Sequence, residues 1–169
     1  PSVAFMFDVI FGLLLWVPLS LYFGVNISYI PKVIPYAILS AVLSEALYFY
    51  ALSKGQLSIT SILLGSYPIY TILFSHFVNK EVLSNIQLLF VGITILGTLI
   101  TYTPSKLNYK ELLDSRAVIW PVIAAVAVGI SDAFSKQIID VTQDYTFLFV
   151  LAFVQIPVAL IYLKIENQS

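Results

Sequence analysis

The sequence predicts an all-α integral membrane protein with six membrane-spanning helices. Three observations predict this class: 60% of the 169 residues are hydrophobic, only 10% are charged, and the mean hydropathy is +0.96. Apolar stretches of about 20 residues recur along the chain, which is the length that a helix needs to cross the hydrocarbon core. Because that core holds no water, each spanning segment must satisfy its own backbone polar groups as a helix. The stretches also lack the strict alternation of a membrane β-barrel.

The composition also narrows the functional classes. The net charge of −1 gives no basic surface for nucleic acid, and the absence of cysteine excludes a disulfide framework and a thiolate nucleophile. The chain has one histidine and neither an HExxH nor a GxSxG motif, which argues against an intramembrane enzyme. It also lacks GxxxxGK[ST], which argues against ATP-driven transport by this chain. We therefore expect no enzyme activity, no cofactor and no metal site.

Six helices are expected from the apolar stretches, with ends set by caps, prolines and charged residues. They cover approximately Val3–Phe23, Val33–Ser53, Ser58–Val78, Asn85–Tyr102, Ala117–Ile138 and Tyr145–Leu163. Lys54 and Gly55 end the second helix, because a cation suits the last turn and a glycine suits the C-cap. Ser84 and Gln87 are spaced for a capping box at the start of the fourth.

Three prolines lie inside predicted spans and are expected to kink them. They are Pro18, Pro68 and Pro157. Pro68 would remove a hydrogen bond in the middle of the third helix and leave a carbonyl near Leu64 without its partner. A broken helix is tolerated in a membrane where neighbours or cavity water satisfy such a group. The residues around the break are therefore candidates for a cavity wall, with a purely structural kink as the alternative: Ser66, Tyr67 and Tyr70.

Glu45 lies near the centre of the second predicted helix, with Ser44 and Tyr48 beside it. A charge at that depth costs about 2.5–3.5 kcal/mol on insertion scales. Glu45 is therefore expected to face the bundle interior or a wet cavity, or to be neutral. We interpret this group as part of a substrate or proton pathway. A buried glutamate bonded to a neighbouring helix is the alternative.

Asp132 and Lys136 are the charged residues near the end of the fifth predicted helix. They are four residues apart with the acid first, which is the favourable order for an ion pair on a helix. The pair is a second candidate for the substrate or proton pathway, or else a structural ion pair at the membrane edge. Asp8 and His76 lie nearer to helix ends and are expected at the interface.

Small residues recur at spacings that let helices approach closely. We expect the following to serve helix packing: Ser61, Gly65, Gly92, Gly97, Ala125, Gly129 and Ala133.

An internal repeat relates the first helix to the sixth. Trp16-Val17-Pro18 resembles Gln155-Ile156-Pro157, and the two prolines are 139 residues apart. The second segment lies five helices further along the chain, an odd number, so the second copy must lie upside down in the membrane. The repeat predicts that one helix precedes this segment and three follow it.

Several motifs resemble the EamA-type carriers of the drug/metabolite transporter superfamily. They are the Tyr67-Pro68 helix, Lys80-Glu81, Leu83-Ser84, Gln87, Gly92 and Gly97, with Ala51–Gly55 upstream and Gly129–Asp132 and Ser135-Lys136 downstream. The resemblance implies a ten-helix fold of two inverted five-helix repeats. Residues 1–103 would then be the first repeat without its first helix, 104–116 a linker, and 117–169 the first two helices of the second repeat.

The resemblance also implies a function. We expect a secondary transporter that moves a small solute or metabolite by alternating access, with proton coupling as a further hypothesis. Its partners would be the lipid bilayer, the solute, and either the missing helices or further copies of the chain, in the plasma (inner) membrane. A structural or assembly protein without transport activity is the alternative, because the packing motifs alone allow it.

The repeat makes a testable prediction about the parent protein. Two copies of the 139-residue repeat predict a protein of about 280 residues with ten spans. Sequencing of the gene on both sides of this segment checks it. A reading frame limited to these six spans would contradict the repeat.

Overall fold

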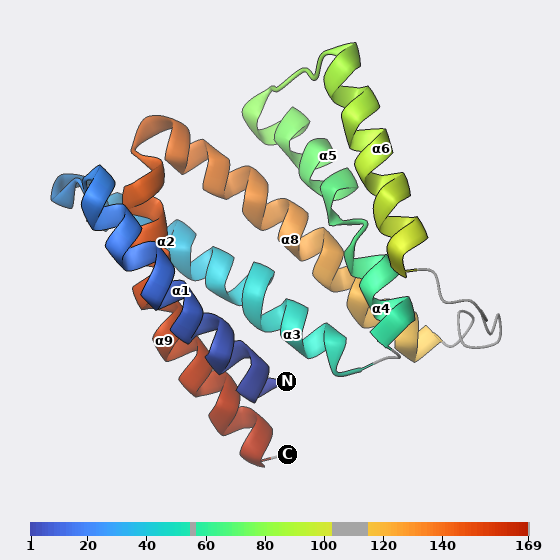
Figure 1. Cartoon of the computed structure of the whole chain (residues 1–169), viewed down its shortest axis with the longest axis horizontal. Helices are drawn as coiled ribbons and strands as arrows, with labels where there is room; N and C mark the ends of the chain where they lie inside the picture. The colour runs from blue at the N-terminus through green and yellow to red at the C-terminus, as the bar shows by residue number, and fades with distance from the viewer. Residues whose placement is uncertain (55–56, 103–114, 169) are drawn as a thin grey trace.

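The computed structural model describes residues 1–54, 57–102 and 115–168, and these residues form helices joined by short connections (Figure 1). The helices are α1 (Ser2–Phe23), η1 (Ile27–Tyr29), α2 (Ile30–Ser40), η2 (Ala41–Ala46), α3 (Leu47–Leu52), α4 (Leu57–Leu64), α5 (Tyr67–Asn79), α6 (Asn85–Tyr102), α8 (Ser115–Val141) and α9 (Asp144–Gln168). No strand occurs in these ranges, so the predicted all-α class is confirmed.

Five stretches of the described chain are long and apolar enough to span a membrane. They are Ser2–Phe23, Ile27–Leu52, Thr60–Asn79, Val118–Val141 and Asp144–Asn167. The sixth predicted span is α6, which has the expected ends, but its described apolar part, Asn85–Gly97, is shorter. Residues 104–114 of the predicted linker lie outside the described ranges, and its last two residues begin α8.

Helix α8 is the centre of the arrangement. It contacts α2, η2, α3, α4, α5 and α9, and it is the most buried of the five spans. The α1–α9 pair packs mainly against α2 and η2, which lie between it and α8, and α6 contacts α4 at the opposite edge (Figure 1).

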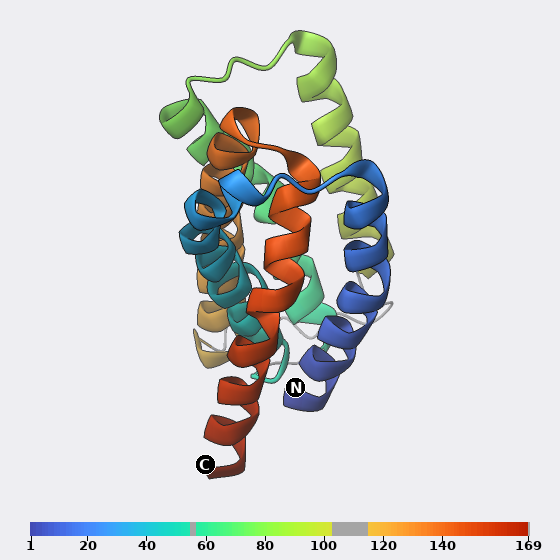
Figure 2. The same cartoon turned by 90° about the vertical axis from the view of Figure 1, so that its left-hand side faces the viewer.

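Helices α1 and α9 pack against each other in opposite directions. Phe23 at the end of α1 stacks on Tyr145 at the start of α9, with 4.5 Å between ring centroids. At the other end of the pair, Phe5 meets the edge of Tyr162 at 6.0 Å. The N- and C-termini therefore lie at the same end of the molecule (Figure 2).

Two of the expected long helices are interrupted. The third is divided into α4 and α5 by Gly65 and Ser66, and Pro68 occupies the first turn of α5. The Ser66 hydroxyl donates a 2.6 Å hydrogen bond to the Leu63 carbonyl, which satisfies one acceptor at the break. The second expected helix contains a π-helical turn, η2, that the sequence did not predict. Pro18 and Pro157 lie inside α1 and α9, which continue through them.

The capping box predicted at the start of α6 is confirmed. The Gln87 backbone N–H donates to the Ser84 hydroxyl at 3.4 Å, and the Ser84 backbone N–H donates to the Gln87 side-chain oxygen at 2.9 Å. These bonds satisfy donors that the first turn of a helix leaves without partners.

Gly129 of α8 is where the backbones of α5 and α8 come close together. A Cβ atom built at Gly129 would lie 2.6 Å from the Tyr70 Cβ and 2.7 Å from the Thr71 backbone nitrogen. Real Cβ atoms essentially never approach other heavy atoms this closely, so any side chain here would push the helices apart. Close approach through small residues is the usual way for helices to pack in membranes.

Gly129→Ala is predicted to destabilise the protein. Alanine is the better helix former by about 1 kcal/mol, but overpacking against backbone atoms costs typically about 1–3 kcal/mol. Thermal unfolding of the full-length protein in detergent should therefore show a lower midpoint. The matched control is Gly12→Ala, whose new Cβ would lie in ordinary contact, 3.5 Å from the nearest atom. Equal midpoints for the two variants would contradict the close α5–α8 contact.

Candidate functional site

A polar cavity lies between the middle of the second span, α5 and α8. Its volume is about 280 Å³. Its lining residues are Ser44 and Glu45 of η2, Tyr48 of α3, Tyr67 of α5, and Val128 and Asp132 of α8. Five of the eight residues predicted for the substrate or proton pathway therefore line one cavity, although they come from three spans.

Asp132 is held in this cavity by α5. The Thr71 hydroxyl donates to the Asp132 carboxylate at 2.9 Å. Thr71 is also one of the residues against which Gly129 packs. The close contact of the two helices thus brings Thr71 within hydrogen-bond reach of Asp132.

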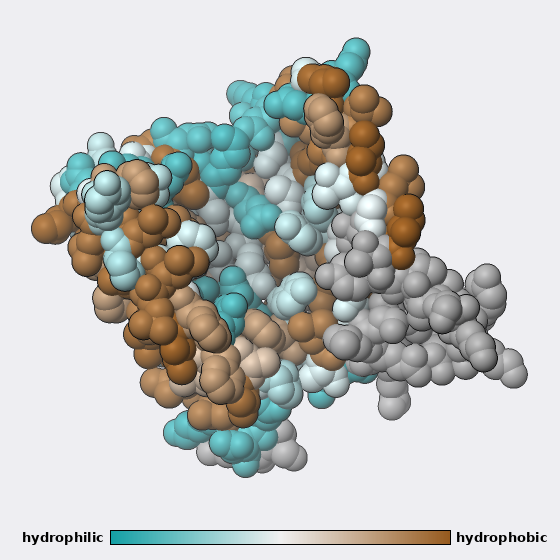
Figure 3. Space-filling model, viewed as in Figure 1, coloured by the Kyte–Doolittle hydropathy of each residue, from teal (hydrophilic) through white to brown (hydrophobic). Residues whose placement is uncertain are grey.

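Glu45 also lines a second cavity, on the side of α1 and α9, with a volume of about 420 Å³. Its polar lining residues are Asp8 of α1, Glu45 of η2 and Gln155 of α9, and Trp16 is among its apolar ones. Among the described residues, no lysine, arginine or histidine lines either of the two cavities that contain Glu45. Figure 3 shows hydrophilic residues in the hollow between the apolar helix faces.

Sequence reasoning missed Asp8 and Gln155 as site residues. Asp8 was expected at the interface because it lies early in its helix, and Gln155 was noted for the repeat alone. The repeat contained a usable signal, since it aligns Gln155 with Trp16, and both residues line this cavity. The two copies of an inverted repeat are related by a symmetry axis in the membrane. Aligned residues that face each other, such as Trp16 and Gln155, therefore lie close to that axis.

The π-helical turn η2 carries both Ser44 and Glu45. In η2 the backbone bonds run to the fifth residue, as from the Leu47 N–H to the Val42 carbonyl. Such turns are rare and are frequent at functional sites. Hydropathy does not distinguish this bonding from that of an α-helix, which is why the sequence did not predict it.

The other predicted pathway residues on α5 and before it lie in helix contacts. The Ser66 hydroxyl donates to the Leu63 carbonyl, and Tyr70 packs against Gly129.

Of the expected packing residues, Ala125 and Ala133 are completely buried. Ser61 and Gly65 line a third cavity of about 230 Å³. A Cβ added at Gly92 or Gly97 would meet no heavy atom of the described chain within 4 Å.

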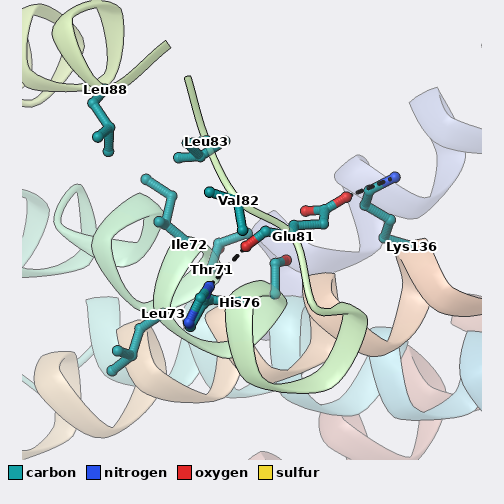
Figure 4. Close-up of a pocket in the computed structure, with 10 residues that line it drawn as sticks. Thr71, Ile72, Leu73, His76, Glu81, Val82, Leu83, Leu88 and Lys136 are labelled. Atoms are coloured by element: carbon teal, nitrogen blue, oxygen red, sulfur yellow. Dashed lines mark hydrogen bonds and ion pairs between the residues drawn. The ribbon is translucent and has the colours of Figure 1, made fainter. Parts of the chain in front are cut away.

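The ion pair expected between Asp132 and Lys136 is wrong. The Lys136 ammonium instead lies 3.0 Å from Asp140 and 3.1 Å from Glu81 of the α5–α6 connection. Asp132 and Asp140 each lie four residues from Lys136 in α8. Lys136 pairs with Asp140, whereas Asp132 accepts a hydrogen bond from Thr71 where α5 contacts α8. Figure 4 shows Lys136 directed at Glu81, beside a cavity of about 460 Å³ that Ile72, Val82 and Leu88 line on its apolar side.

Comparison with known proteins identifies the family. Residues 1–103 match the EamA-like transporter family. This chain belongs to the EamA-like transporter family. The resemblance drawn from the Lys80–Gly97 motifs is thereby confirmed, and the chain is an integral membrane protein.

One curated relative of this EamA-like chain is an uncharacterized transporter from Clostridium kluyveri. The two are 24% identical over 133 residues, which cover 78% of this chain and 43% of the relative. The chain thus spans less than half of that relative's length. No solved structure matches the chain. Within the described residues, no group of three or more His, Cys, Asp or Glu side chains is placed to hold a metal ion.

Lys136 is predicted to hold the α5–α6 connection of the EamA-like protein against α8. Lys136→Met removes the ammonium that pairs with Glu81, so backbone amides of residues 80–84 should exchange hydrogen faster. Hydrogen exchange of the full-length protein with mass spectrometry measures this. Lys80→Met is the matched control, because the described chain gives Lys80 no ion pair. Unchanged exchange in Lys136→Met would show that the pair contributes nothing to the position of the connection.

Proposed function

We propose that this chain is part of a secondary carrier that moves a small polar or amphipathic solute by alternating access, with Glu45 as the proton-coupling group. Membership of a transporter family supports carriage of a solute. The observation on which the proposal chiefly depends is the position of Glu45, which lines both the cavity toward α8 and the cavity toward α1 and α9.

The surroundings of Glu45 favour a proton-binding role. The titratable groups that face it are Asp8 from α1, Asp132 from α8, and Tyr48 and Tyr67. No basic side chain is found among the described residues that line either cavity. The three carboxyl groups therefore cannot all ionise without mutual repulsion. Uptake of a proton by Glu45 relieves that repulsion, and a change in cavity access would then release the proton on the other side.

Two features support alternating access. Helices α1 and α9, which carry the internal repeat, pack in opposite directions, as the two copies of an inverted repeat would. The break between α4 and α5 also lies beside one of these cavities, since Tyr67 lines the cavity toward α8 and Gly65 lines the neighbouring third cavity. Broken helices at a repeat interface are a common feature of binding sites in secondary transporters. We place the whole protein in the plasma (inner) membrane, with the remaining helices of both repeats completing the transport path.

Glu45→Gln is predicted to keep the fold and remove the pH dependence of transport. The amide has nearly the same size and shape as the carboxyl group but binds no proton in this pH range. The measurement is solute flux by the full-length protein in liposomes with an imposed pH gradient, across a panel of small polar solutes. Glu45→Ala should also lower the flux itself.

The matched control is Glu81→Gln, which removes a glutamate outside both Glu45 cavities. Its flux should keep its pH dependence even if its rate changes. Unchanged pH-driven flux in Glu45→Gln would make Glu45 a packing residue and would move the coupling site to Asp132 or to other helices of the protein.

A further inference from the structure

The cavity between α1, η2 and α9 is lined by carboxyl, amide and aromatic side chains, whereas the described lining of the cavity toward α8 contains no amide. Two carboxyl groups and one amide face it, from Asp8, Glu45 and Gln155. The rest of the lining is apolar or aromatic: Phe11, Gly12, Leu15, Trp16, Leu148 and Leu151. Its volume of about 420 Å³ is within the range of small-molecule sites.

Gln155 gives independent evidence of a ligand. The residue is only 5% exposed, and its side-chain oxygen lies beside Gly12, so the amide lies against α1 at the cavity. Within the described residues this amide makes no hydrogen bond to the protein. The amide atoms are not among the fully buried side-chain atoms that lack a partner, so they are accessible from the cavity, where a bound molecule or water would complete their hydrogen bonding.

We propose that this cavity binds the ammonium group of a small organic cation. Asp8 and Glu45 would accept charge-assisted hydrogen bonds from the ammonium, and the Gln155 carbonyl oxygen would accept a third. The rings of Trp16 and Phe11 suit a positive charge or the apolar body of such a molecule. A metal ion fits less well, because the described residues contain no group of three or more His, Cys, Asp or Glu side chains placed to hold one.

This inference deepens the proposed function, since Glu45 belongs to both cavities and the ammonium class narrows the solute. A cation bound between Asp8 and Glu45 would compete with a proton for the same carboxyl groups. That competition would couple the release of the proton to the binding of the cation.

The test measures binding rather than transport. The probe is 2-phenylethylammonium, and its comparators are 2-phenylethanol, which is uncharged, and 3-phenylpropanoate, which is anionic. Isothermal titration of the full-length protein in detergent, near neutral pH, should show the ammonium binding at least about tenfold more tightly than either comparator.

Variants place the binding in this cavity. Asp8→Asn and Gln155→Leu should each weaken ammonium binding by about tenfold, the usual effect of losing a hydrogen bond to a charged group. The matched controls, Asp144→Asn and Gln137→Leu, change the same residue types outside the lining and should keep the affinity. Thermal unfolding verifies that each variant is folded. If Asp8→Asn does not fold, the affinity of Gln155→Leu alone decides the test.

The results separate the two proposals. Equal affinity for the three probes, absence of binding, or full affinity in Asp8→Asn or Gln155→Leu overturns the ammonium site. Ammonium-selective binding lost in these variants supports it, even if Glu45→Gln keeps pH-driven flux and the coupling proposal fails. Conversely, coupling at Glu45 stands if the pH dependence is lost in Glu45→Gln while the amine does not bind.

Discussion

The close contact of α5 with α8 at Gly129 is the constraint on which the rest of the arrangement depends. Helix α8 touches most of the other helices, and α5 approaches it most closely at Gly129, where a side chain would clash with the α5 backbone. The same pair of helices brings Thr71 to Asp132, and the connection that follows α5 brings Glu81 to Lys136. In a membrane, where lipid is as apolar as the helices, such packing replaces the hydrophobic effect as the force between helices.

Glu45 shows how a costly residue is accommodated in this arrangement. A carboxyl group at mid-membrane must face protein or a polar cavity, and η2 places Glu45 between two such cavities. The surrounding acids and tyrosines come from α1, α3, α5 and α8, and none of the described residues that line the two cavities is a lysine or arginine. This pattern of charge distinguishes the site from a structural ion pair such as that of Lys136 with Asp140.

Local sequence signals predicted the helices well, because they act within a few turns. The capping box of Ser84 and Gln87 formed as expected, and α6 has the predicted ends. The same local reasoning paired Asp132 with Lys136, since four residues separate them. That prediction was wrong because Asp132 bonds to Thr71 of α5 and Lys136 pairs with Glu81 of the α5–α6 connection. Spacing along one helix does not reveal partners on another segment.

The sequence by itself determined that this chain is an all-α membrane protein of the EamA-like family, because hydropathy, caps and motifs are properties of contiguous residues. It also singled out Glu45 from the cost of a buried charge. Only the tertiary structure decided which side chains share a cavity with it, including Asp8 and Gln155. These residues are up to 147 positions apart in the chain, and their meeting depends on the antiparallel packing of α1 on α9, which no local pattern specifies.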